Sequence, residues 1–202
     1  MLKILDIGSG PESVAAIVFK DEEKEITRLD ANADLNPDVV HDITTPLPAE
    51  LCDRFDIVYC SHVMEHIDRL KVLPTLQNLS RALRDRGELW VVVPSLEWVA
   101  REILNGRDGL HIQGHIFGGQ ATPWDYHRVG FTLLGLRQSL EVVGLVTRKA
   151  YQSPFEIEVS INDQKHIYHC LQNVVIGARV DGFADLVAGK KPEVETQEAR
   201  AT

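Results

Sequence analysis

The residues best suited to receive a ligand lie close to the start of the chain, where Asp6 is followed by Gly8 and Gly10. An apolar strand that runs into a Gly-x-Gly turn and then into a helix is typical of a nucleotide-type cofactor site at the carboxyl edge of a parallel sheet. Pro11 suits the first turn of that helix, and the free N–H groups there favour an anion. Ser13 stands where the dinucleotide pattern has its third glycine.

Two further acids follow the next predicted strands. Asp30, twenty residues after Gly10, can accept both hydroxyls of a ribose. Asp42 can accept from the exocyclic amine of an adenine while Ile43 packs on the ring. Each acid also has a local alternative, a surface position at a strand end for Asp30 and a turn cap for Asp42. Asp6, inside the first strand, needs a partner, either a ligand ammonium or backbone N–H groups.

The histidines offer acid–base or metal chemistry. His62, Glu65 and His66 match H-x-x-E-H, the inverted-zincin pattern. The pattern follows a buried strand, whereas a zincin needs it within a long helix together with a further carboxylate ligand, so we expect no metal site. His127, within the segment W-D-Y-H-R at 124–128, could be a general base because the unperturbed imidazole pKa is about 6.5. The alternative is a solvated loop cluster. The histidines at 111, 115, 127, 166 and 169 could form a metal site, but isolated loop histidines are more simply interpreted as solvated.

The elements that must position these residues alternate between strands and helices. Helices are predicted over residues 11–21, from Pro74 with leucines at helical spacing up to Leu83, and from Thr132 to Gly144. Strands are predicted at 3–7, 26–30, 38–42, 55–60, 88–93, 145–151 and 172–180. This order predicts the α/β class, with a Rossmann-like, mostly parallel seven-stranded sheet, helices on both faces and an antiparallel edge strand at the C-terminal end.

Residues 1–189 are predicted to form one domain. Residues 106–130 hold six of the fourteen glycines, which indicates a lid or an acceptor-binding loop. Residues 190–202 have almost nothing to bury and are expected to be a disordered tail.

Composition narrows the class of protein. The formal net charge of −9 argues against a nucleic-acid partner. Three cysteines without a C-x-x-C pattern argue against structural zinc and disulfides, which favours a cytoplasmic location. No apolar run is long enough to cross a bilayer, so no membrane association is expected.

Taken in order, the segment 6–10, Asp30, residues 41–48 and residues 55–67 resemble the class I S-adenosylmethionine-dependent methyltransferases, most closely the methyltransferase type 11 branch. Residues 79–89 resemble that family's turn into the fifth strand, with Arg86 in place of a usual glycine. The similarity covers residues 3–95 and, more loosely, 123–180.

The resemblance implies S-adenosylmethionine as the cofactor and gives each matched residue a role. From the methionine end to the adenine end these are Gly8 and Gly10 along the methionine, Asp6 at its ammonium group, Ser61 and His62 beside the reactive methyl, Asp30 on the ribose, and Asp42 with Ile43 at the adenine. Methyl transfer otherwise needs proximity, alignment and removal of the acceptor's proton. His127 and His62 are therefore the predicted catalytic residues.

The acceptor is expected to be a small molecule or sugar-like, because residues 117–131 resemble methyltransferases linked to cell-surface sugar pathways. Many relatives place helices before the first strand that cover the cofactor. We therefore expect an open cleft, closed by the glycine-rich loop or by a second subunit of a homo-oligomer. The alternatives are a cofactor-binding module without catalysis, a zinc hydrolase, and a nicotinamide-dependent oxidoreductase, against which the missing third glycine and Asp42 argue.

Overall fold

The computed structural model describes residues 1–107, 109–161 and 164–180, so the predicted tail at 190–202 lies outside the described residues. Its centre is a seven-stranded sheet with the order β3-β2-β1-β4-β5-β7-β6. The strands are β1 (Leu2–Ile7), β2 (Lys24–Asp30), β3 (Val39–Val40), β4 (Phe55–Ser61), β5 (Leu83–Pro94), β6 (Val146–Ile161) and β7 (Gln164–Ala178). The first five are parallel, and β7 pairs antiparallel with both β5 and β6. This confirms the predicted mixed sheet, with the antiparallel pairing at its C-terminal edge.

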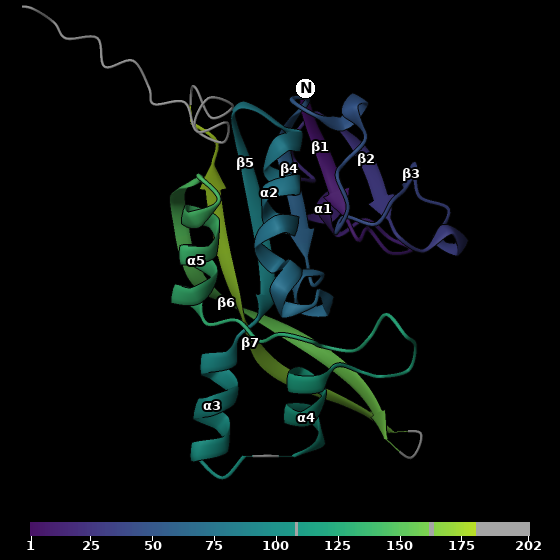
Figure 1. Cartoon of the computed structure of the whole chain (residues 1–202). Helices are drawn as coiled ribbons and strands as arrows, with labels where there is room; N and C mark the ends of the chain where they lie inside the picture. Colours follow the sequence, from purple (N-terminus) through teal and green to yellow (C-terminus); the bar gives the residue numbers. More distant parts are fainter. Residues whose placement is uncertain (108, 162–163, 181–202) are drawn as a thin grey trace, which may run out of the picture.

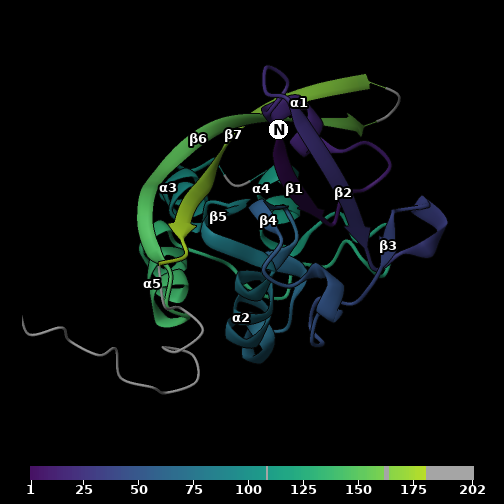
Figure 2. The same cartoon turned by 90° about the horizontal axis from the view of Figure 1, so that it is seen from above.

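Helices cover both faces of the sheet (Figures 1 and 2). On one face, α2 (Val72–Ala82) and α5 (Leu133–Val142) contribute Leu76, Leu79 and Leu136 to the largest apolar core. On the other face, α1 (Val14–Val18) and the residue after it, Phe19, pack on β1 and β4. Among the described residues, no helix combines the length and apolar character that crossing a membrane requires.

Several local boundaries differ from the sequence prediction. Helix α1 begins at Val14 and not at Pro11, because the hydroxyl of Ser13 accepts from the Ala16 N–H and caps it. Leu83 belongs to β5, since α2 ends at Ala82. Two helices, α3 (Leu96–Leu104) and α4 (Leu110–Phe117), were not predicted. Helix α4 occupies part of the glycine-rich segment 106–130, so that segment is not loop throughout.

Strands β6 and β7 are also longer than predicted and continue past the end of the sheet as a hairpin (Figure 1). The extension meets α3 and α4, and together they form a small separate core. Its buried members are Trp98, Val99, Ile112 and Cys170. This layer lies beyond the carboxyl ends of the parallel strands, where α/β proteins bind their ligands.

A buried polar network joins this layer to the sheet. The Gln152 amide donates to Ser95 Oγ at 2.7 Å and to Asn173 Oδ1 at 3.1 Å. Asn173 in turn donates to Glu97 Oε2 at 3.0 Å, and Glu97 accepts from the backbone N–H of Leu133. These contacts connect the end of β5, α3, α5 and both hairpin strands at the point where the hairpin leaves the sheet.

Candidate active site

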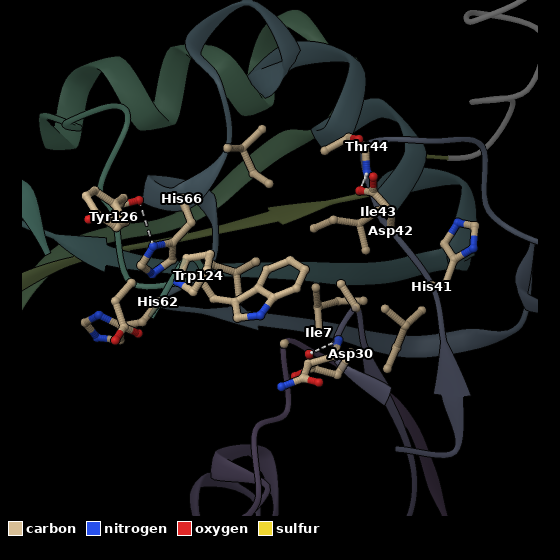
Figure 3. A pocket seen from close by; sticks show the side chains of 18 of the residues that line it. Ile7, Asp30, His41, Asp42, Ile43, Thr44, His62, His66, Trp124 and Tyr126 are labelled. Atoms are coloured by element: carbon tan, nitrogen blue, oxygen red, sulfur yellow. Dashed lines mark hydrogen bonds between the residues drawn. The ribbon is translucent and has the colours of Figure 1, made fainter. Parts of the chain in front are cut away.

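A pocket of about 940 Å³ opens at the carboxyl ends of β1, β2 and β4. Ile7, Asp30 and Ile43 line one end, His62 and His66 line the other, and residues 122–126 close over it from the α4 side. Figure 3 shows the indole of Trp124 lying across the pocket between these ends. The volume is at the upper end of the range of about 300–1,000 Å³ that small-molecule sites occupy.

Two glycines shape the turn that follows β1. Gly8 and Gly10 have φ angles of +61° and +62°, a region that favours glycine. A Cβ on Gly8 would lie 2.3 Å from Val63 Cγ2, whereas a Cβ on Gly10 would have no atom within 4 Å. Gly8 is therefore fixed by packing, and Gly10 faces open space in which a ligand can lie.

Asp30 ends β2 and holds this turn. Its Oδ2 accepts from the Gly10 N–H at 3.1 Å and its Oδ1 from the Asn32 N–H at 2.9 Å. A carboxylate has about four lone-pair sites, so each oxygen can accept one more donor. The acid thus fits two neighbouring hydroxyl donors, as a ribose provides.

Asp42 and Ile43 line the far end of the pocket. Asp42 Oδ1 accepts from the Thr44 N–H at 2.9 Å, so this side chain does cap its turn, as the alternative interpretation held. Asn78 of α2 donates to the carbonyls of Ile43 and Thr45 at 3.2 and 2.9 Å and so fixes the wall of the pocket. Asn78 was not predicted as a site residue, because the only signal in the sequence is an amide between the apolar residues of a helix.

Asp6, Gly10 and Ser61 are not among the residues that line the pocket. Asp6 is 2% exposed, lies behind the glycine turn and accepts from the hydroxyl of Ser13. Burial raises the pKa of Asp6, and the hydrogen bond from Ser13 opposes part of that rise. Ser61 is half-buried at the end of β4.

His62 directly follows β4 and lines the pocket, with a left-handed φ of +54°. Its Nδ1 lies 3.3 Å from Glu65 Oε1 in the short 3₁₀ helix Met64–His66, and its Nε2 lies 2.9 Å from Gln172 Oε1 of β7. Burial alone would lower the pKa of His62, but the hydrogen bond and charge of Glu65 outweigh it and raise that pKa. Two partners therefore fix the ring at the end of the pocket.

His127 does not line the large pocket. It lines a second cavity of about 20 Å³, together with Glu65 and His115. Burial lowers the pKa of His127, and burial lowers the pKa of His115 to about 4. The two predicted catalytic histidines thus lie in different cavities, with His66 next to the ring of His127 at a centroid distance of 4.9 Å. In the sequence, Glu65 and His66 stand out only as part of the zincin pattern.

Comparison with known proteins identifies the class. A family model described as a methyltransferase domain matches residues 2–136, so the chain belongs to that family. No curated protein sequence matches the chain.

The fold is shared with many solved structures, among them the following three. A candidate methyltransferase from Bacillus halodurans is 12% identical, with a TM-score of 0.61 over 89% of this chain and 93% of the other. An S-adenosylmethionine-dependent methyltransferase from Methanosarcina mazei is 16% identical, with a TM-score of 0.60 over 89% and 92%. Another from Archaeoglobus fulgidus is 16% identical, with a TM-score of 0.55 over 88% and 86%.

The family confirms an enzyme of the methyltransferase class whose cofactor is S-adenosylmethionine. The pocket agrees with that cofactor on its own geometry, because an acid with two free acceptor sites and a buried isoleucine line one cavity beside the turn at Gly8. No metal is implied by this class alone.

Proposed function

We propose that this protein transfers the methyl group of S-adenosylmethionine to a hydroxyl of a small, sugar-like acceptor. The observation that carries the proposal is the single pocket that extends from Asp30 and Ile43 to His62 and Trp124. One cavity can therefore hold a nucleoside at one end and an acceptor at the other. Trp124 is 58% exposed at its rim, where an aromatic face can pack against the apolar side of a sugar ring.

Within this proposal the cofactor lies along the residues that the sequence indicated. Asp30 accepts the two ribose hydroxyls, and Ile43 packs on the adenine, with Asp42 at its amine. The turn at Gly8 and Gly10 runs beside the methionine half. Asp6 acts from behind this turn by holding its shape through Ser13, which contrasts with a direct contact to the ammonium group.

The reaction needs a base for the acceptor hydroxyl. As the oxygen forms its bond to the methyl carbon, the carbon–sulfur bond breaks and its electron pair goes to sulfur, which leaves S-adenosylhomocysteine. We assign removal of the hydroxyl proton to His62, because it lines the pocket and Glu65 lies beside its Nδ1, as a carboxylate lies beside the histidine of a catalytic triad. Its Nε2 can accept that proton only in the neutral ring with the hydrogen on Nδ1, after the contact with Gln172 Oε1, itself an acceptor, has opened. His127 is less well placed for this role, because it faces the second cavity.

The test is formation of S-adenosylhomocysteine from methyl-labelled S-adenosylmethionine with a panel of free sugars, glycosides and other small alcohols. We expect turnover with at least one hydroxyl acceptor. His62→Ala should lower the chemical rate by roughly 100-fold while cofactor affinity stays within a few-fold. Cofactor binding without product from any acceptor would instead support a binding module that lacks catalysis.

A further inference from the structure

Glu65 has a buried carboxylate whose closest basic neighbour, His62, approaches only one of its two oxygens. The residue is 2% exposed, and neither Oε1 nor Oε2 has a hydrogen-bond partner among the described residues. The nearest basic group is Nδ1 of His62, at an ion-pair distance of 3.3 Å. A buried carboxylate without donors is costly unless a cation or a metal compensates it. His62 faces Oε1, whereas Oε2 of Glu65 has no partner among the described residues and is free to bind a cation.

Two histidines beside it are held in the form that binds metals. Nδ1 of His66 lies 3.1 Å from the Tyr126 carbonyl, and Nδ1 of His127 lies 3.1 Å from the His115 carbonyl. A carbonyl oxygen only accepts, so each Nδ1 must carry the proton, and the lone pair of the neutral ring is then on Nε2. A backbone carbonyl that fixes the ring in this way is the usual outer partner of a metal-binding histidine.

The three side chains converge. One oxygen of Glu65 and one ring nitrogen each of His66 and His127 lie within 4.8 Å of one another. Ligand atoms around one zinc ion are about 3–4 Å apart, because each bond is about 2.0–2.2 Å long. A side-chain adjustment of about 1 Å would therefore complete the set.

An independent feature lies at the same place. The second cavity, of about 20 Å³, is lined by Glu65, His127 and His115, and it is large enough for one ion or one water. His115 is 4% exposed, and its Nε2 has no hydrogen-bond partner among the described residues. The Glu65 carboxylate and the unpartnered Nε2 of His115 thus meet in one small cavity, and His66 forms part of the wall of the cofactor pocket beside it.

We propose that Glu65, His66 and His127 bind one divalent transition-metal ion, with His115 offering a further nitrogen to the same cavity. Two imidazoles and one carboxylate are a ligand set of catalytic zinc sites, which keep a position open for water or substrate. This set differs from the zincin pattern, because His62 is bonded to Gln172 and takes no part. The proposal replaces our expectation of no metal.

The ion would also define the acceptor, a step that rests on the proposed function. A hydroxyl on a divalent metal loses its proton more readily, as metal-bound water does. The oxygen then forms its bond to the methyl carbon, the carbon–sulfur electron pair goes to sulfur, and the proton leaves to the base or to water in the pocket. No oxidant or reductant is needed. The acceptor class is thus an oxygen ligand of the metal, such as one hydroxyl of a diol.

Titration of the full-length, untagged protein with Co²⁺ tests the site, since Co²⁺ in such a set has visible absorption bands that Zn²⁺ abolishes on displacing it. We expect one Co²⁺ per chain, and at least ten-fold weaker binding in His66→Ala, His127→Ala and Glu65→Gln. The matched control is His169→Ala, an exposed histidine on the hairpin that pairs with Glu156, and it should bind Co²⁺ as the parent does.

A parent-like circular dichroism spectrum and one cooperative thermal transition show that each variant is folded. If Glu65→Gln does not fold, the two histidine variants carry the test. Absence of Co²⁺ bands in the parent, or equal bands in His127→Ala, would overturn the metal site. Full methyl transfer after removal of metal with a chelator would overturn its catalytic role and leave the proposed function standing. Normal Co²⁺ binding without methylation of any acceptor would support the site and overturn the proposed function.

Discussion

Asp30 is the residue whose contacts bear most directly on cofactor binding. Each of its oxygens accepts one backbone N–H and can accept one further donor. A hydrogen bond to a charged group contributes about 1.5–3 kcal/mol, so we expect Asp30→Ala to weaken S-adenosylhomocysteine binding ten-fold or more. Isothermal titration calorimetry measures this. Asp34→Ala, which removes an exposed carboxylate from the neighbouring turn, is the control. Unchanged affinity in Asp30→Ala would exclude the ribose role.

Gly10 is expected to resist substitution for two separable reasons. Its φ of +62° is unfavourable for a β-branched residue, and the space beside its Cα is where the ligand should lie. Gly10→Val should therefore abolish cofactor binding. Gly106→Val is matched for strain, because Gly106 has a φ of +72° and no atom within 4 Å of an added Cβ, but it lies away from the pocket. If calorimetry finds normal binding in Gly10→Val, the turn is only a connector.

At the level of elements, Glu97 joins the helices beyond the sheet to β7. Burial disfavours its charge, but hydrogen bonds from Asn173 and the Leu133 N–H outweigh burial and lower the pKa of Glu97 below its ordinary 4.5. A lowered pKa means that the carboxylate stabilises the fold above about pH 4.5 and loses this effect as the pH falls through its folded-state pKa.

The free energy of unfolding of Glu97→Gln should therefore be about 1–2 kcal/mol lower than that of the parent at pH 7, and this difference should disappear in acid. Urea unfolding of both proteins between pH 7 and pH 3.5 measures this difference. The exposed Glu22→Gln is the control, and it should track the parent at every pH. A difference that persists unchanged at the lowest pH would mean that Glu97 acts by packing and not by charge.

The parallel core was predicted well, because its strands are short apolar runs bounded by turn residues. The glycines at 8 and 10 also indicate the turn that follows β1. Helix α3 was missed, although Ser95 is a local N-cap whose hydroxyl accepts from the Trp98 N–H. The hairpin itself was underestimated, although residues 155–161 alternate between apolar and polar side chains, a pattern typical of a strand. Its distal half packs on helices far away in sequence, which local patterns do not show.

The site was predictable in part, because some of its residues directly follow strands that the sequence predicts. Asp30 and Ile43 are local to strand ends, so their placement at the sheet edge follows from the strand order. That Glu65, His115 and His127 line one cavity does not follow from the strand order, because it depends on where residues 110–130 fold back over β4. Arg86 is a position where the residue type differs from the family but the backbone conformation does not. It departs from the family's glycine, and it does adopt the left-handed φ, +62°, that favours glycine.

For the molecule as a whole, the pocket lies between two layers. The sheet supplies Ile7, Asp30 and Ile43, and the segment that follows α4 supplies Trp124 and Tyr126. A ligand held between both should stabilise them together, because it binds the folded state and not the unfolded chain. At a concentration 100 times its Kd, S-adenosylhomocysteine should add about 2.7 kcal/mol to the free energy of unfolding. For a chain of this size that corresponds to a rise in Tm of roughly 5–11 °C.

Thermal unfolding followed by circular dichroism, at several concentrations of S-adenosylhomocysteine, measures this effect. We expect one cooperative transition that moves upward with the logarithm of ligand concentration. In Asp30→Ala the same curve should be displaced to at least ten-fold higher concentrations, since only the affinity changes. Two transitions, of which the ligand shifts one, would show that the α3–α4 layer unfolds independently and that residues 122–126 contribute nothing to binding. A Tm that does not respond at concentrations found saturating by calorimetry would contradict the two-layer pocket altogether.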